Sequence, residues 1–144
     1  MGNRAVITFD QNRQPTSLGI YLHWNGGAES VLAFLEACDK LEVRDDSDPS
    51  YQAARLVQII GNFFGGTCSV GVNTLQNLDC DNGDNGIFVV SRKRGEITIQ
   101  NAPDLKSPLV PVDLEKVRKS SYWTKTPSIL TEILEAQGDA FKRG

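Results

Sequence analysis

The chain has 144 residues, of which 40% are hydrophobic and 23% are charged, and its net charge is −3. This length is that of a typical single domain, and the composition excludes the disordered class. The mildly acidic balance does not favour direct binding of nucleic acid, which we do not expect. No apolar run approaches the roughly 20 residues that cross a membrane, and no membrane contact is expected.

Two strands are predicted near the N-terminus, at residues 5–9 and 19–24. The first is apolar and β-branched. The second alternates, so that its even-numbered residues from Ile20 to Trp24 share one face. We expect the two strands to form a hairpin and Trp24 to lie in the core.

Two helices are predicted next, at residues 28–41 and 50–64, because apolar residues recur there at spacings of three and four. Pro49 suits the first turn of the second helix. The pair Gly65-Gly66 is typical of a helix end. The second helix has the wider apolar stripe, so we expect it to be the most buried element.

Three more strands are predicted at residues 67–72, 87–91 and 96–100. The last two flank the segment 92–95, which is predicted to turn the chain in a hairpin. Gly95 would supply the positive φ that this turn needs.

The C-terminal third is predicted to be helical in two places. A short helix at 114–121 would be capped by Asp113. In the last helix Thr126 would be the cap and Pro127 the first residue, with apolar residues continuing as far as Phe141.

The order of these elements predicts an α+β fold, in which helices cover one face of a mostly antiparallel sheet of about five strands. Residues 1–102 would form the α+β core domain. Residues 103–144 would form a C-terminal helical extension packed on the same domain. The last helix is also a candidate contact between copies of the chain.

The turn between the second strand and the first helix is a candidate ligand site. Backbone N–H groups at a helix start can bind phosphate or carboxylate, and glycine lets a ligand approach closely. His23, Asn25, Gly26 and Gly27 are therefore candidate binding residues. Because neither glycine-rich phosphate motif is present, a purely structural turn is the competing interpretation.

The loop that precedes residue 87 carries three aspartates, Asp79, Asp81 and Asp84, which are candidate ligands for a divalent cation. The spacing departs from the EF-hand pattern, because Gly83 stands where an acid or amide is required. A tight turn with solvated aspartates is the competing interpretation.

Two groups of residues are candidate contacts for a macromolecular partner. Arg92, Lys93 and Arg94 would form a basic hairpin tip. Tyr122 and Trp123 form an aromatic pair of the kind that anchors interfaces. The competing interpretations are a solvated strand end that discourages pairing and an aromatic pair that docks on its own domain.

The cysteines and the histidine do not predict a reaction centre. Cys38, Cys68 and Cys80 are irregularly spaced, which indicates reduced thiols in a cytoplasm rather than a disulfide framework. His23 is the single histidine, and the sequence places no thiol beside it. We predict no catalytic residue and no cofactor, and we lean toward a protein that is not an enzyme.

The segments GNRAVITF at 2–9, IYLHWNGG at 20–27 and DNGDNG at 81–86 carry a resemblance. They are similar to segments of a family of small uncharacterised proteins encoded by bacteriophages and prophages. This resemblance implies a mobile-element origin and a location in the host cytoplasm. It implies no catalytic residue, because the family has no established activity.

By analogy of context with small phage accessory proteins, we expect a non-enzymatic protein that binds a host protein or protein–nucleic acid complex. An inhibitor of bacterial defence, of the anti-CRISPR kind, would fit. One alternative is a protein or enzyme that binds a small anion or nucleotide at the turn near His23. Another is a structural or assembly protein of the virion.

Overall fold

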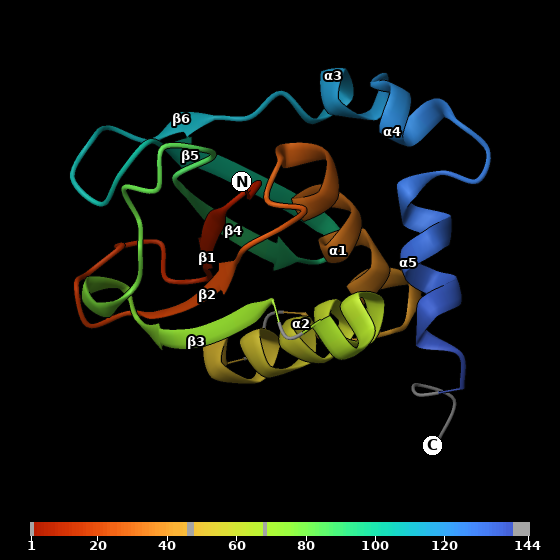
Figure 1. The fold of residues 1–144 in the computed structure, drawn as a ribbon, viewed down its shortest axis with the longest axis horizontal. Helices are drawn as coiled ribbons and strands as arrows, with labels where there is room; N and C mark the ends of the chain where they lie inside the picture. The colour runs from red at the N-terminus through yellow and green to blue at the C-terminus, as the bar shows by residue number, and fades with distance from the viewer. Residues whose placement is uncertain (1, 46–47, 68, 140–144) are drawn as a thin grey trace.

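The first two strands form the hairpin that the sequence predicts. β1 (Ala5–Thr8) pairs antiparallel with β2 (Leu18–Leu22), with Ile7 opposite Ile20. The computed structural model describes residues 2–45, 48–67 and 69–139 (Figure 1).

The described residues build one sheet with the strand order β3-β2-β1-β4-β5-β6. Its other strands are β3 (Val70–Thr74), β4 (Ile87–Lys93), β5 (Glu96–Ala102) and β6 (Val110–Pro111). β1 and β4 run parallel, whereas the other neighbouring pairs are antiparallel. The mostly antiparallel sheet is confirmed, and β6 adds one strand to the five expected.

Two long helices follow the first hairpin, as predicted. They are α1 (Ala28–Lys40) and α2 (Pro49–Phe64), and the C-terminal part adds α3 (Leu114–Arg118), α4 (Ser121–Thr124) and α5 (Ile129–Gln137). Figure 1 shows α5 lying alongside α1 and α2, at the side of the molecule away from β6. Among the residues described, no helix combines the length and apolar character that crossing a bilayer requires.

The core divides between the two faces of the sheet. On one face, strand side chains pack with α1, α2 and α5, and this main cluster contains Ile7, Leu22, Phe88, Val90, Leu32, Phe34, Leu56, Ile60 and Ile133. On the other face, a smaller cluster of Val6, Leu75, Cys80, Ile87 and Ala102 is covered by Leu78, Leu105 and Leu109, which lie outside the strands. The helices therefore cover one face, as predicted, and loop segments cover the other. The prediction that α2 is the most buried element is wrong, because α1 has eight buried residues and α2 has five.

The ends of the helices follow local chemistry. Asp48 caps α2 by accepting a hydrogen bond from the Ser50 N–H at 3.0 Å, and Gly65 ends the helix with φ of 64°. Asp113 caps α3 through the N–H of Lys116, as predicted. The predicted cap of α5 is wrong, because Ser128 rather than Thr126 accepts the hydrogen bond of the first turn.

The turn between β4 and β5 contains only two residues, Arg94 and Gly95, with φ of 54° and 76°. This confirms the positive φ expected at Gly95. Both strands are longer than predicted, because two successive residues with positive φ make the tight turn that suits a twisted hairpin. Arg92 and Lys93 therefore belong to β4 and not to the turn.

Candidate functional site

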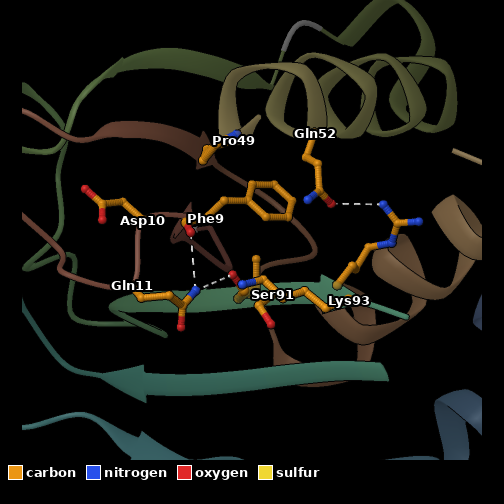
Figure 2. Close-up of a pocket in the computed structure, with 9 residues that line it drawn as sticks. Phe9, Asp10, Gln11, Pro49, Gln52, Ser91 and Lys93 are labelled. Carbon is orange, nitrogen blue, oxygen red and sulfur yellow. Dashed lines mark hydrogen bonds between the residues drawn. The ribbon is translucent and has the colours of Figure 1, made fainter. Parts of the chain in front are cut away.

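A cavity of about 470 Å³ opens just past the end of β1, alongside the last residues of β4 (Figure 2). The end of β4 lies along it, and the first turn of α2 closes it on another side. Its lining residues are Phe9, Asp10, Gln11, Pro49, Gln52, Val90, Ser91, Arg92 and Lys93. The cavity thus joins polar groups from three segments that are distant in the sequence.

Arg92 lies beneath this cavity and is almost completely buried, with 2% of its surface exposed. Its Nη2 donates to Asp39 Oδ1 at 2.7 Å and to the carbonyl of Val43 at 2.7 Å, and its Nη1 donates to Gln52 Oε1 at 3.0 Å. The prediction that Arg92 belongs to an exposed basic tip is wrong. Because β4 continues to Lys93, Arg92 follows Val90 in the alternation and points to the helix face.

Gln52 joins Arg92 to the cavity and has 6% of its surface exposed. Its Oε1 must face Arg92, because a guanidinium can only donate. The amide nitrogen Nε2 is therefore turned the other way, and Figure 2 shows it on the side of the Phe9 ring. No described residue accepts a hydrogen bond from it.

A second hollow, of about 200 Å³, lies at the turn between β2 and α1. Its lining residues are Asn3, Trp24, Asn25, Gly27, Glu29, Ser30 and Tyr122. Trp24 is 44% exposed and Tyr122 is 48% exposed. We call this feature, with its two exposed rings, the aromatic hollow.

The prediction that Trp24 lies in the core is wrong. β2 ends at Leu22, so the alternation that places Ile20 and Leu22 inward does not extend to residue 24. Asn25, with φ of 57°, then redirects the chain. The Trp24 ring instead meets His23 edge to face, with 5.1 Å between ring centroids.

The two residues of the predicted aromatic pair lie in different environments. Trp123 is half-buried, packs against the main core and donates from Nε1 to the carbonyl of Glu29 at 3.0 Å. Trp123 thus docks α4 on the start of α1. For this residue, docking on its own domain, the alternative to an interface anchor, is what the structure shows. Tyr122, by contrast, is exposed at the aromatic hollow.

The glycine turn at residues 25–27 is occupied by contacts within the chain. The N–H of Gly26 donates to the carbonyl of Asn3 at 2.8 Å, and a Cβ on Gly26 would lie 2.5 Å from that oxygen. The Asn25 amide donates to Ser30 Oγ at 3.2 Å. Because the carboxylate of Glu29 also lies beside Gly27, these contacts do not favour an anion, and that site stays a prediction.

His23 lies at the end of β2 beside Tyr21. The Tyr21 hydroxyl and His23 Nδ1 are 2.9 Å apart. Burial raises the pKa of Tyr21 above its ordinary value, and neighbouring Arg4 opposes that shift. His23 therefore has a polar partner two residues earlier in the chain.

The aspartate loop faces a cation of the chain itself. Arg4 Nε donates to Asp84 at 2.8 Å, and Arg4 Nη1 lies 3.6 Å from Asp79. The hydrogen bonds from Arg4 hold the pKa of Asp84 below its usual value. Asp81 is exposed, and in the part of the chain that is described no group of three or more acidic, histidine or cysteine side chains is arranged to hold a metal ion.

The described thiols lie in environments that favour the protonated thiol over the thiolate. Burial raises the pKa of Cys38 to about 12. Burial also raises the pKa of Cys80, whose Sγ lies 3.4 Å from the carbonyl of Leu75. Since the thiolate is the reactive form, neither is activated as a nucleophile. Cys68 lies outside the described residues, as does Phe141.

Of the predicted partner contacts, Lys93, Arg94 and Tyr122 are exposed, whereas Arg92 and Trp123 serve the fold.

Comparison of the chain with protein-family models, with curated proteins and with solved structures finds no match. The aromatic hollow and the polar cavity beside Gln52 are two concave features that join segments distant in the sequence.

Sequence reasoning named Asn25, Gly27 and Tyr122 of the aromatic hollow, but it missed other residues that line these two features. Gln52 and Glu29 carry no motif, so no local signal marked them. For Arg92 a signal was present, since the alternation of Phe88 and Val90 on one face of β4 continues to residue 92. Extending the predicted strand by two residues would have placed this side chain in the core.

Proposed function

We propose that this chain is a non-enzymatic phage or prophage protein that acts by binding a host macromolecule, with the aromatic hollow at the centre of its contact surface. The observation that carries the proposal is that Trp24 and Tyr122, both nearly half exposed, border the same hollow. Following the resemblance, we propose a protein of the bacterial defence machinery as the target.

Both rings are positioned before any partner arrives. The contact with His23 orients Trp24. The hydrogen bond from Trp123 to Glu29 fixes the short helix that carries Tyr122. Anchors that are already ordered lose little side-chain entropy on binding, and tryptophan and tyrosine are enriched among the residues that dominate interface energies.

The rim of the hollow indicates what kind of surface would fit. Asn3 and Asn25 can donate and accept hydrogen bonds, and Glu29 contributes a carboxylate. A lysine or arginine side chain could pair with this carboxylate and lie over the aromatic rings, which attract cations. This favours a protein surface with a basic side chain over a nucleic-acid backbone.

The proposal is tested by capture from a lysate of the bacterial host with a tagged chain. We expect a stoichiometric partner with the wild type. We expect its loss when Trp24→Ala and Tyr122→Ala are combined, because truncating one hot-spot residue costs about 2 kcal/mol or more, a factor of about 30 in affinity.

The matched control is Val72→Ala combined with Val110→Ala, which shortens two exposed apolar side chains at the opposite edges of the sheet. This variant should capture the partner as the wild type does. The absence of a stoichiometric partner, or equal capture by the double aromatic variant, would refute the proposal. Circular dichroism should confirm that both variants are folded.

A further inference from the structure

We infer that the cavity at the ends of β1 and β4 is a peptide site, which binds a short extended segment carrying one apolar side chain. This site is distinct from the aromatic hollow, and the inference stands whether or not that hollow binds a partner. It depends on an open strand edge, a buried amide with a free donor, an adjoining apolar hollow and the local charge.

The topology creates the crevice. β1 and β4 are parallel neighbours in the middle of the sheet, but β1 leads to β2 on one side and β4 leads to β5 on the other. Connections that leave in opposite directions open a crevice at the carboxyl ends of the two strands, which is where open sheets with parallel strands commonly bind ligands. The cavity lies at this point.

The crevice exposes the edge of β4. The Val90 carbonyl faces β1, but β1 has ended, and the side-chain Nε2 of Gln11 donates to this carbonyl at 2.9 Å (Figure 2). Backbone groups two residues apart on a strand point to the same side. The N–H and C=O of Arg92 therefore face the crevice, beyond the last residue of β1, and can pair with one residue of an added strand.

Gln52 adds a donor that the fold leaves unused. Its side chain is more than nine-tenths buried, its oxygen is held by Arg92, and its Nε2 faces the cavity without a described acceptor. Because Nε2 opens into the cavity, a ligand carbonyl can accept a hydrogen bond from it. A peptide carbonyl beside the Arg92 edge supplies such an acceptor.

A smaller apolar hollow continues from the cavity beneath α2. It measures about 250 Å³, shares Phe9, Asp10 and Pro49 with the cavity, and is otherwise lined by Ile7, Leu18, Ile20, Asp48, Ser50 and Ala53. Leu18 is 39% exposed there. In strand addition the main chain provides affinity and such hollows select side chains, so an apolar residue fits here.

The charges around the site do not favour a phosphate-bearing ligand. Asp10 lines both hollows and Asp48 stands at the start of α2. Hydrogen bonds from the N–H and hydroxyl of Ser50 lower the pKa of Asp48, so its carboxylate is ionised at neutral pH. Arg92 is paired with Asp39, and Lys93 is the other cation among the residues that line the cavity. An uncharged peptide backbone suits this balance better than a nucleotide does.

The test is a titration of the 15N-labelled chain, followed by NMR, with N-acetyl-leucine N-methylamide. This probe is one blocked residue, with two amide N–H groups, two carbonyls and an apolar side chain. We expect saturable shifts of the Arg92 backbone amide and the Gln52 side-chain amide, with a dissociation constant on the order of 1 mM. N-acetyl-glycine N-methylamide should bind about tenfold more weakly, because it buries no side chain.

Leu18→Asp should abolish the response to the leucine probe, because it places a charge in the apolar hollow. Val110→Asp places a charge at an exposed apolar residue of β6, at the other edge of the sheet, and should leave the titration unchanged. The inference is overturned if the leucine probe shifts neither amide, or if Leu18→Asp and Val110→Asp respond alike. It is also overturned if adenosine monophosphate shifts both amides as strongly as the leucine probe.

Discussion

Arg92 ties three segments together at a single buried charge. Its guanidinium contacts Asp39 on α1, Val43 after α1 and Gln52 on α2. We expect Arg92→Leu to lower the free energy of unfolding by about 3 kcal/mol, the lower end of the usual range for a broken buried pair. The lower end applies because the Asp39 side chain is 30% exposed and water can solvate it. Urea unfolding measures this loss.

Lys93→Leu is the control for this prediction, because it removes the neighbouring charge from an exposed position. It should change the free energy of unfolding by no more than about 0.5 kcal/mol. Equal stability of Arg92→Leu and Lys93→Leu would show that the buried network contributes nothing. Both substitutions remove one positive charge at neighbouring positions. The difference between their free energies of unfolding therefore reports the effect of burial.

Residue-level prediction from the sequence was weakest where an element ends. Trp24 was predicted to be buried because it continues the alternation of Ile20 and Leu22, but β2 ends before it. Arg92 was predicted to be exposed because its two basic neighbours suggested a turn. In both cases the alternation was read correctly, but the end of the strand was placed two residues from its true position. Such an error decides whether the last side chain of the pattern lies in the core or in solvent.

At the scale of elements, two glycines with open space around them should respond oppositely to the same substitution. Gly61 lies within α2, and Gly95 occupies the hairpin turn with φ of 76°; a Cβ on either would meet nothing within 4 Å. We expect Gly61→Ala to raise the free energy of unfolding by about 0.5 to 1 kcal/mol, because alanine loses less backbone entropy in a helix. Gly95→Ala should lower it by about 1 kcal/mol, because a side chain disfavours positive φ.

Thermal unfolding of the two glycine variants beside the wild type checks both signs. Since neither substitution meets a steric contact, each serves as the control for the other. If both variants shifted the midpoint in the same direction, backbone conformation would not be the determining factor at these positions.

The elements themselves were largely predictable because their signals are local. The apolar spacing in α1 and α2, Pro49 at the start of α2 and the glycine after β4 each act within a few residues. The two-residue β6 was missed because its pairing with β5 is set by the sheet and not by its own sequence. The parallel pairing of β1 with β4 was not predictable for the same reason, and it creates the cavity.

At the scale of the whole molecule, the C-terminal segment is continuous with the core. Ile129 and Ile133 of α5 belong to the main cluster, with 4% and 0% of their surfaces exposed. Gln137 donates to the carbonyl of Ile59 on α2 at 3.0 Å. The apolar side of α5, which made this helix a candidate contact between copies, is thus engaged within the chain.

This integration predicts that damage to α5 destabilises the fold as a whole. We expect Ile133→Ala to lower the free energy of unfolding by about 3 kcal/mol, because it leaves a cavity between α5 and the two long helices. Glu135→Ala, an exposed change on the same helix, should stay within about 0.5 kcal/mol of the wild type. Urea unfolding followed by tryptophan fluorescence measures both variants, since Trp24 and Trp123 both lie outside α5. If residues 103–144 were instead a separable arm that joins copies of the chain, Ile133→Ala would change the mass measured by light scattering and leave the unfolding midpoint in place.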